Sequence, residues 1–136
     1  MTRSTTTAVI TVVLLLVLGA LASGQAAKGD LWEITSQPSM EGVPIKMPSS
    51  TTKVCAAKEW KEPPGGQKNC KNSNMKTEGT KVTWDVQCTG PSMTGHGEII
   101  RDGASAFDGT IKFSSDQGNM TVKLSGRKLG ECDSPQ

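Results

Sequence analysis

The sequence is poor in the side chains that most catalytic sites need. It contains no tyrosine, two phenylalanines and one histidine, His96. Any Ser-His-Asp or Cys-His site would have to use that single residue. A phosphate-binding loop, a dinucleotide-binding fingerprint and a zinc-protease motif are also missing. We therefore assign no catalytic residue and no cofactor, and we expect the protein not to be an enzyme.

An excess of either charge is absent as well. The 136 residues include 15 lysines and arginines and 13 aspartates and glutamates, and the acids are scattered singly among the lysines. This balance argues against a nucleic-acid partner. Asp85 and Glu98 approach each other if their strands pair, yet two acids without a groove do not make a glycosidase. An enzyme would need a pocket that gathers Asp85, Glu98 and His96, and it is the least supported hypothesis.

Long hydrophobic runs are absent except for one near the N-terminus. An apolar stretch from Ala8 to Leu18 follows Arg3 and precedes several small residues, which is the pattern of a secretory signal peptide. The stretch is shorter than the ~20 residues that span a bilayer. We predict a signal peptide over residues 1–26, cleaved between residues 22 and 27. The mature protein is then exported without a transmembrane anchor, and the bacterial periplasm is the expected compartment.

Closely spaced cysteines are missing. Cys55, Cys70, Cys88 and Cys132 are separated by 14, 17 and 43 residues, whereas zinc and iron–sulfur sites use close pairs. An even number of cysteines in an exported chain is typical of a disulfide framework. The four residues are therefore predicted to form two disulfides and to bind no metal.

Two pairings of these cysteines are compatible with the sequence. Cys55–Cys70 would close the Pro-Pro-Gly-Gly loop, and a loop of about 15 residues is worth roughly 3 kcal/mol by the chain-entropy argument. Cys88–Cys132 would then tie the C-terminal tail to the central hairpin. The rival pairing places Cys70 opposite Cys88 across a hairpin and leaves Cys55 to bond Cys132. We favour the first pairing because cross-strand neighbours are already held by the ladder.

Helical periodicity is missing after the leader, and short alternating segments take its place. Val82, Trp84 and Val86 alternate with polar residues, as in a half-buried strand. The expected strands cover residues 30–37, 50–55, 70–78, 80–88, 93–100, 105–113 and 120–125, with one turn of helix over 56–60. The sequence predicts an all-β fold with little helix. We expect a single domain over 28–133, built as a small antiparallel meander that forms a barrel or half-barrel.

With the cysteines assigned to disulfides, methionine is the remaining residue type with a soft sulfur ligand. Met40, Met47 and Met93, with His96, would be the residues of a copper site, because Cu(I) prefers thioether sulfur. Methionine is also a flexible filler of small cores that are short of aromatic residues, and we favour that interpretation.

The tryptophans divide into two groups. Trp32 and Trp84 fall on the apolar phase of predicted strands and are expected in the core. Trp60 lies in a loop and is a candidate for a binding contact, together with Met40 and Met47, although packing over the barrel mouth is the favoured role.

Six segments in order resemble one family of exported bacterial proteins, the domain of unknown function 3617. They are Asp30-Leu-Trp-Glu-Ile-Thr, the connector from Met40 to Pro48, Lys53-Val-Cys55, Lys81 to Cys88, Met93-Thr-Gly-His-Gly-Glu98 and Ser125 to Cys132. The resemblance covers essentially the whole mature chain and implies export and a one-domain architecture. It assigns no activity. The family usually has glycine directly before Leu-Trp-Glu, whereas Asp30 intervenes here.

The leading functional hypothesis is a non-enzymatic periplasmic binding or accessory module. Its partner would be a small apolar ligand, held in an apolar, Met-lined cavity or at an edge of the barrel, or another envelope protein. The alternative is periplasmic copper handling through methionines, and the second alternative is an enzyme of unknown class.

Overall fold

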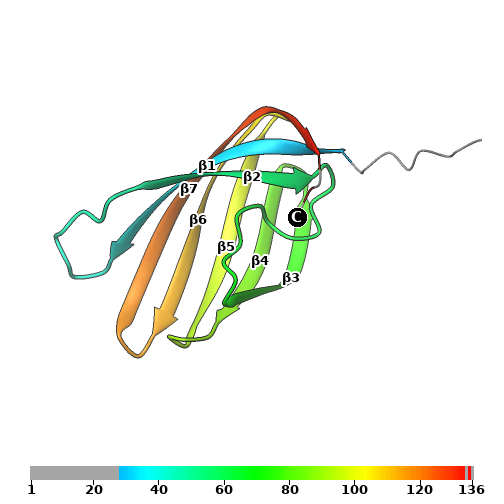
Figure 1. Cartoon of the computed structure of the whole chain (residues 1–136). Coiled ribbons are helices and arrows are strands. Elements are labelled where there is room, and N and C mark those ends of the chain that lie inside the picture. The colour runs from blue at the N-terminus through cyan, green and yellow to red at the C-terminus, as the bar shows by residue number, and fades with distance from the viewer. Residues whose placement is uncertain (1–27, 134, 136) are drawn as a thin grey trace, which may run out of the picture.

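The computed structural model describes residues 28–133 and 135, so the predicted signal peptide lies outside the described part of the chain. The described residues contain seven strands: β1 (Lys28–Met40), β2 (Ser50–Ala57), β3 (Cys70–Glu78), β4 (Lys81–Cys88), β5 (Met93–Asp102), β6 (Ala106–Ser115) and β7 (Gly118–Asp133) (Figure 1). None of these residues forms a helix of the length and apolarity that crossing a membrane requires. The predicted all-β fold is confirmed, as an antiparallel half-barrel with two disulfides.

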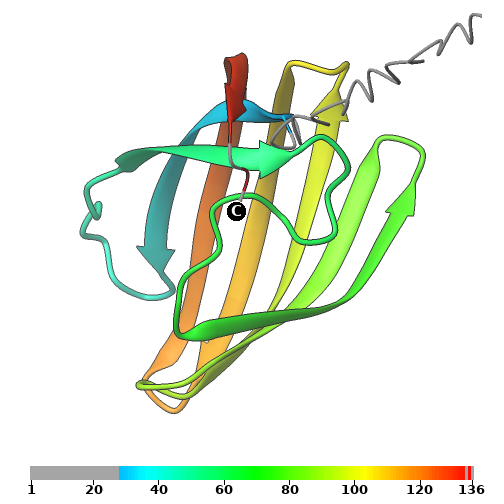
Figure 2. The same ribbon diagram turned by 45° about the vertical axis from the view of Figure 1, so that its right-hand side comes forward.

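The strands form one curved sheet in the order β2-β1-β7-β6-β5-β4-β3. β3 to β7 follow one another as a meander of hairpins, as the regular turn spacing predicts. β1 returns to pair with β7 along its whole length, from Lys28 opposite Asp133 to Met40 opposite Met120. β2 and β3 remain as the two edges, and the sheet curls without closing between them (Figures 1 and 2).

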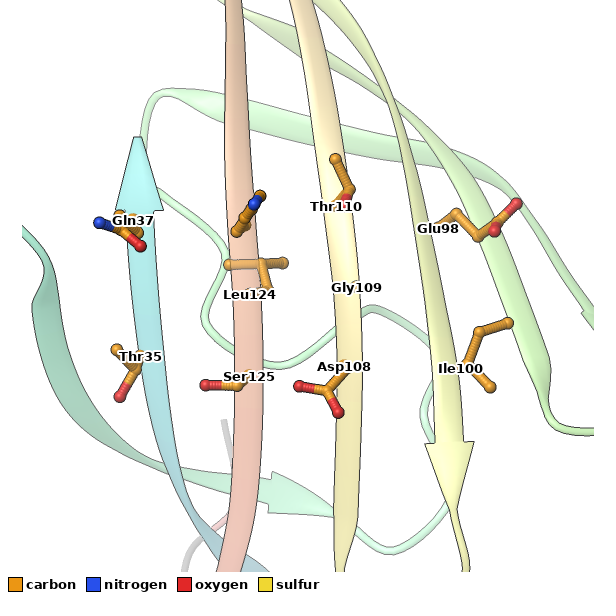
Figure 3. A pocket seen from close by; sticks show the side chains of 10 residues that line it. Thr35, Gln37, Glu98, Ile100, Asp108, Gly109, Thr110, Leu124 and Ser125 are labelled. Atoms are coloured by element: carbon orange, nitrogen blue, oxygen red, sulfur yellow. The ribbon is translucent and has the colours of Figure 1, made fainter. Parts of the chain in front are cut away.

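Alternation along the strands, interrupted by register shifts at Leu31/Trp32 in β1 and between Ser73 and Lys76 in β3, separates two faces of this sheet. The concave face carries the core, with Trp32, Trp84, Ile99 and Phe107 at most 2% exposed. The convex face is mostly polar, with Ile100 as an exposed apolar residue. Rows of cross-strand partners run over it, such as Thr35, Ser125, Asp108 and Ile100 on β1, β7, β6 and β5 (Figure 3). Alternation of this kind is expected when one side of an antiparallel sheet is buried.

Two glycines on the concave face make room for the aromatic rings. A Cβ on Gly97 would overlap the indole of Trp84 on the neighbouring strand, and a Cβ on Gly126 would overlap the ring of Phe107. Each ring therefore lies flat against the backbone of the next strand, a close approach for which glycine is suited. The Gly-His-Gly sequence at residues 95–97 follows from this packing, since its glycines face the core and His96 faces outward.

The connection from β2 to β3, residues 58–69, crosses the concave face from one edge of the sheet to the other (Figure 2). We call this segment the strap. The helical turn predicted over residues 56–60 is wrong. β2 instead continues to Ala57, because Ala56 is buried and pairs with Asp30 of β1. Beyond Ala57 the strap leaves the ladder as bends and turns.

Asp30, the acid that interrupts the family pattern, is buried beside a cation. Its side chain is 13% exposed, and its Oδ1 lies 2.9 Å from Nζ of Lys128 on β7. A carboxylate removed from water needs such a partner, because its desolvation is otherwise uncompensated. The ion pair accounts for an acid among the core residues of β1.

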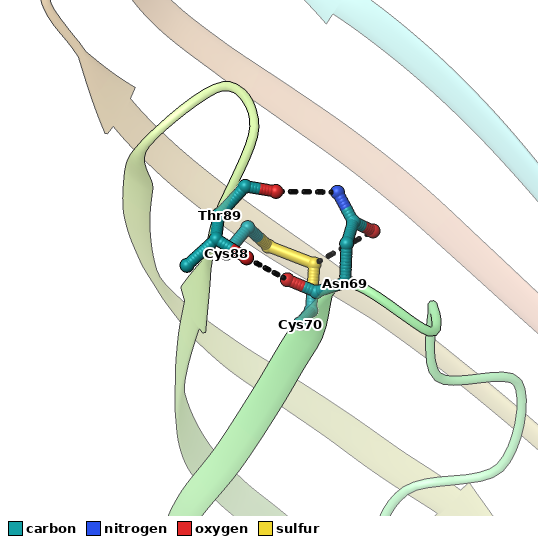
Figure 4. Close-up of a disulfide and its surroundings, with 4 residues drawn as sticks. All are labelled: Asn69, Cys70, Cys88 and Thr89. Atoms are coloured by element: carbon teal, nitrogen blue, oxygen red, sulfur yellow. Dashed lines mark hydrogen bonds between the residues drawn. A yellow bond between two sulfur atoms is a disulfide. The ribbon is translucent and has the colours of Figure 1, made fainter.

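The favoured disulfide pairing, Cys55–Cys70 with Cys88–Cys132, is wrong. The structure contains Cys70–Cys88 and Cys55–Cys132 (Figure 4). Cys70 and Cys88 are direct partners in the β3–β4 ladder, and Asn69 and Thr89 beside them exchange hydrogen bonds of 2.9 and 3.0 Å.

The second bond follows from the strand order. Cys55 and Cys132 lie on β2 and β7, the two strands that flank β1, with their Cα atoms 5.9 Å apart. Loop-closure entropy was the wrong criterion, because the ladder decides which cysteines meet.

Candidate functional site

The single histidine belongs to a polar cluster on the convex face. Nδ1 of His96 lies 2.9 Å from Oδ1 of Asp85, and Nδ2 of Asn74 donates to the other carboxylate oxygen at 2.8 Å. Asn74 reaches that position from an irregular point in β3, where its φ is 52°. The hydrogen bonds from Asn74 and then His96 hold the pKa of the Asp85 carboxyl below its usual value.

This cluster is a set of hydrogen bonds on the protein surface. The side chains of His96 and Asp85 are 60% and 49% exposed, so water competes for both partners and their contact contributes little energy. Glu98 does not join them, since its carboxylate pairs with Lys81 at 3.1 Å. Glu98 does line a hollow on the convex face, but Asp85 and His96 are not part of that lining (Figure 3). The three groups of the enzyme hypothesis are therefore not gathered in one of the described pockets.

The candidate copper ligands are divided between the two faces. Met93 lies on the concave face opposite Cys88 and packs against the core, whereas His96 points outward from the same strand. Met40 ends β1 opposite Met120, and Met47 lies in the connector between β1 and β2. Met93 and His96 cannot reach one ion from opposite sides of a sheet.

Trp60 is a packing residue of the strap. Its ring lies 5.5 Å from those of both Trp32 and Phe107, and the guanidinium of Arg101 lies 4.4 Å above it. Such edge-to-face contacts add to the burial of the rings themselves. Trp60 thereby closes the part of the concave face nearer Lys28 and Asp133, which we call the upper half.

The lower half of the concave face, nearer Met40 and Gly118, holds a cavity of about 130 Å³. Residues 63–67 of the strap form its roof. Large apolar side chains form its floor, namely Trp84, Ile99, Phe107, Ile111, Phe113 and Leu124. Polar but uncharged side chains complete the lining: Ser36, Thr52, Gln67 and Asn72. The site is an apolar hollow between a sheet and a loop.

Part of this floor is incompletely covered. Ile99 and Phe107 are 1% and 2% exposed, but Ile111, Phe113 and Leu124 are only partly buried although they face the core. Apolar surface at such a position gains free energy from any apolar group that covers it, at about 25 cal/mol per Å².

The strap is fixed at its ends and loosely held between them. Lys58 pairs with Glu131 at 2.8 Å next to the Trp60 anchor, and Asn69 bonds Thr89 beside the Cys70 disulfide. Between these anchors the strap touches the floor through Gly65, where a Cβ would lie 3.1 Å from Ile34 Cδ1 and φ is 86°. Only glycine combines that φ with so close an approach.

Sequence reasoning placed the candidate binding residues elsewhere. It selected Trp60, Met40 and Met47, and none of them lines this cavity. The available signal is the Pro-Pro-Gly-Gly sequence, a pattern that predicts a loop but not its position over the floor. It is the one part of the described strap without bulky side chains, and it faces the partly covered floor.

Comparison with known proteins identifies the family. The family model described as "Protein of unknown function (DUF3617)" matches residues 27–132. No curated protein and no solved structure matches the chain. The matched residues begin just before β1 and end at the last cysteine, so they contain nearly all of the half-barrel and both of its disulfides. The chain therefore belongs to the DUF3617 family.

Proposed function

We propose that the protein is a non-enzymatic binding module that holds a small apolar ligand in the cavity beneath the strap. The observation that carries this proposal is the partly covered floor formed by Ile111, Phe113 and Leu124 in the lower half. In an otherwise well-packed core, side chains interdigitate with few voids. An apolar cavity of about 150 Å³ in another protein stays dry and binds benzene, so a cavity of this size has the capacity for a ligand.

The size of the cavity sets the kind of ligand. About 130 Å³ is less than the roughly 300 Å³ at which drug-sized pockets begin. The ligand therefore places one ring or one end of a chain beneath the strap. A ligand of this size has few non-hydrogen atoms, and each contributes at most about 1.5 kcal/mol, so we expect binding that is weaker than that of a drug-sized ligand.

We further propose that the protein works in the bacterial periplasm after its signal peptide is removed. Two disulfides support an oxidising compartment, because such bonds are rare in the cytosol. The predicted leader supports export. The test is the intact mass of the chain recovered from the periplasmic fraction of its host. We expect the mass of a chain whose first residue is one of residues 23 to 27 and in which both disulfides are formed. A full-length reduced chain in the cytoplasm would contradict export.

Blocking the cavity tests the binding function. N-phenyl-1-naphthylamine is an uncharged probe that fluoresces in apolar surroundings, and we expect it to bind the oxidised protein. Ile111→Trp fills the cavity from its floor. It should raise the dissociation constant of the probe at least about tenfold, a loss of about 1.4 kcal/mol of binding free energy. Lys112→Trp is the matched control, since it adds the same ring on the convex face one residue away and should leave binding unchanged.

Two further measurements keep this test decisive. Near-UV circular dichroism shows whether Ile111→Trp retains the packed core. Ile111→Ala enlarges the cavity instead of filling it and should bind the probe at least as well as the original chain. Equal binding by Ile111→Trp and Lys112→Trp would refute the proposal.

A further inference from the structure

We infer that the ligand of this cavity is an uncharged amphiphile, of the class of medium-chain alkyl alcohols, and not the corresponding carboxylate. This inference rests on the function proposed above and adds the chemistry of the ligand's polar end. It is drawn from the lining, in which none of the 18 residues carries a charge at neutral pH. Four of them, Ser36, Thr52, Gln67 and Asn72, offer neutral hydroxyl and amide groups.

The other hollows of the described sheet differ in this respect. The hollow on the convex face is lined by Glu98, Asp108 and Lys123 among others. A third hollow, where the strap lies beside the ends of β2 and β3, is lined by Lys61, Glu62 and Lys68. The charged residues that flank the roof thus contribute to the neighbouring hollow and not to the cavity lining. Among the three, the cavity is the uncharged one.

The four polar residues are placed at the sides of the apolar floor. Ser36 and Thr52 come from β1 and β2 at one side of the open sheet, and Gln67 and Asn72 come from the end of the strap and from β3 at the other. Oγ of Ser36 is within 2.9 Å of Oγ of Ser50, so this hydroxyl already exchanges hydrogen bonds on the β2 side. An alkyl chain that covers Ile111 and Phe113 leaves its polar end among these groups.

Desolvation determines which polar end is tolerated. A hydroxyl that enters such a site can exchange its water hydrogen bonds for bonds to neutral groups at little cost. An ionised carboxylate without a cation loses far more, and it binds a proton instead. The preference should therefore depend on pH. The preference for the alcohol over the acid is large where the unbound acid is ionised. It shrinks as the pH falls towards the ordinary pKa of a carboxylic acid, about 4–5.

The experiment compares 1-octanol with octanoate on the oxidised protein. Trp84 lines the cavity, so tryptophan fluorescence reports occupancy. At about pH 8 we expect the alcohol to bind at least about tenfold more tightly than the acid, which is fully ionised there. Near pH 4.5 the difference should fall to a few-fold, because about half of the acid is then neutral.

A charge-insertion variant sharpens the comparison. Thr52→Lys adds a cation to the cavity lining from an exposed edge strand, and it should raise octanoate affinity about tenfold at pH 8. Thr51→Lys is the matched control. Its residue faces the other side of the sheet, where Oγ1 lies 3.0 Å from Oγ1 of Thr35, and it should change nothing.

The possible outcomes separate the two proposals. Equal or tighter binding of octanoate at pH 8 overturns the inference and leaves the binding function standing. If that octanoate affinity is lost in Lys61→Met or Lys68→Met, the acid is held by the neighbouring hollow. Binding of neither compound, together with failure of the uncharged fluorescent probe, overturns the proposed function and the inference with it.

Discussion

The two halves of the concave face are built from the same strands and are covered differently. In the upper half, Trp32 and Val82 are 1% exposed, and the ring of Trp60 packs against Trp32 and against Phe107, whose ring also reaches the floor of the lower half. In the lower half, Ile111, Phe113 and Leu124 lie beneath prolines and glycines and stay partly exposed. The strap thus covers one half with an aromatic ring and the other with small or rigid residues. The first half is suited to stability, and the second is the half for which we propose a binding role.

The largest expected effect comes from truncating one aromatic residue in each half. Trp32→Ala should cost roughly 3–5 kcal/mol, since it leaves a cavity beneath Trp60 and Phe107. That is a large part of the 5–15 kcal/mol expected for a domain of this size. Phe113→Ala should cost less than about 2 kcal/mol, because its side chain is only partly buried. Urea unfolding of the oxidised protein measures both. Equal losses would remove the distinction between the halves.

A smaller effect is expected from the glycine beneath Trp84. Gly97→Ala places a methyl group into the indole ring and should cost about 1–3 kcal/mol of unfolding free energy through overpacking. Gly130→Ala is the control, because a Cβ there meets no atom within 4 Å. The two variants can be compared by thermal unfolding. If both shift the midpoint equally, the change acts through strand propensity and not through contact with Trp84.

The sequence predicts the strands well because one face of the sheet is buried. Val82, Trp84 and Val86 alternate with polar residues, and all three lie in the core. The order of the strands in the sheet is harder to predict from the sequence, because the pairing of Lys28 with Asp133 joins residues at the two ends of the domain. The disulfide pairing depends on that order and was missed for the same reason.

The cavity was also beyond sequence reasoning. Its roof is a Pro-Pro-Gly-Gly segment whose sequence indicates a loop but not the surface over which the loop passes. The methionines were selected by composition, yet their strand phase places Met93 and His96 on opposite faces. The alternation that predicts the strands also predicts this separation, and it is the signal that the copper hypothesis neglected.

The smallest expected effect concerns the convex face and the pH. The depressed pKa of Asp85 means that its stabilising contribution is present above the unfolded value near 3.8 and is lost as the pH falls through the lower folded value. The oxidised protein should therefore lose slightly more stability below about pH 4 than Asp85→Asn does. Unfolding midpoints between about pH 2.5 and 6 provide the measurement. Parallel curves would show that Asn74 and His96 do not favour the ionised carboxyl.

Native mass spectrometry of protein purified from its own host tests the central claim most directly. The original chain should carry an additional small neutral mass that organic solvent releases. Ile111→Trp, expressed and purified in the same way, should carry none, while Lys112→Trp should keep it. An unliganded mass for the original chain, or the same adduct on Ile111→Trp, would contradict the assignment of the lower half as a binding site.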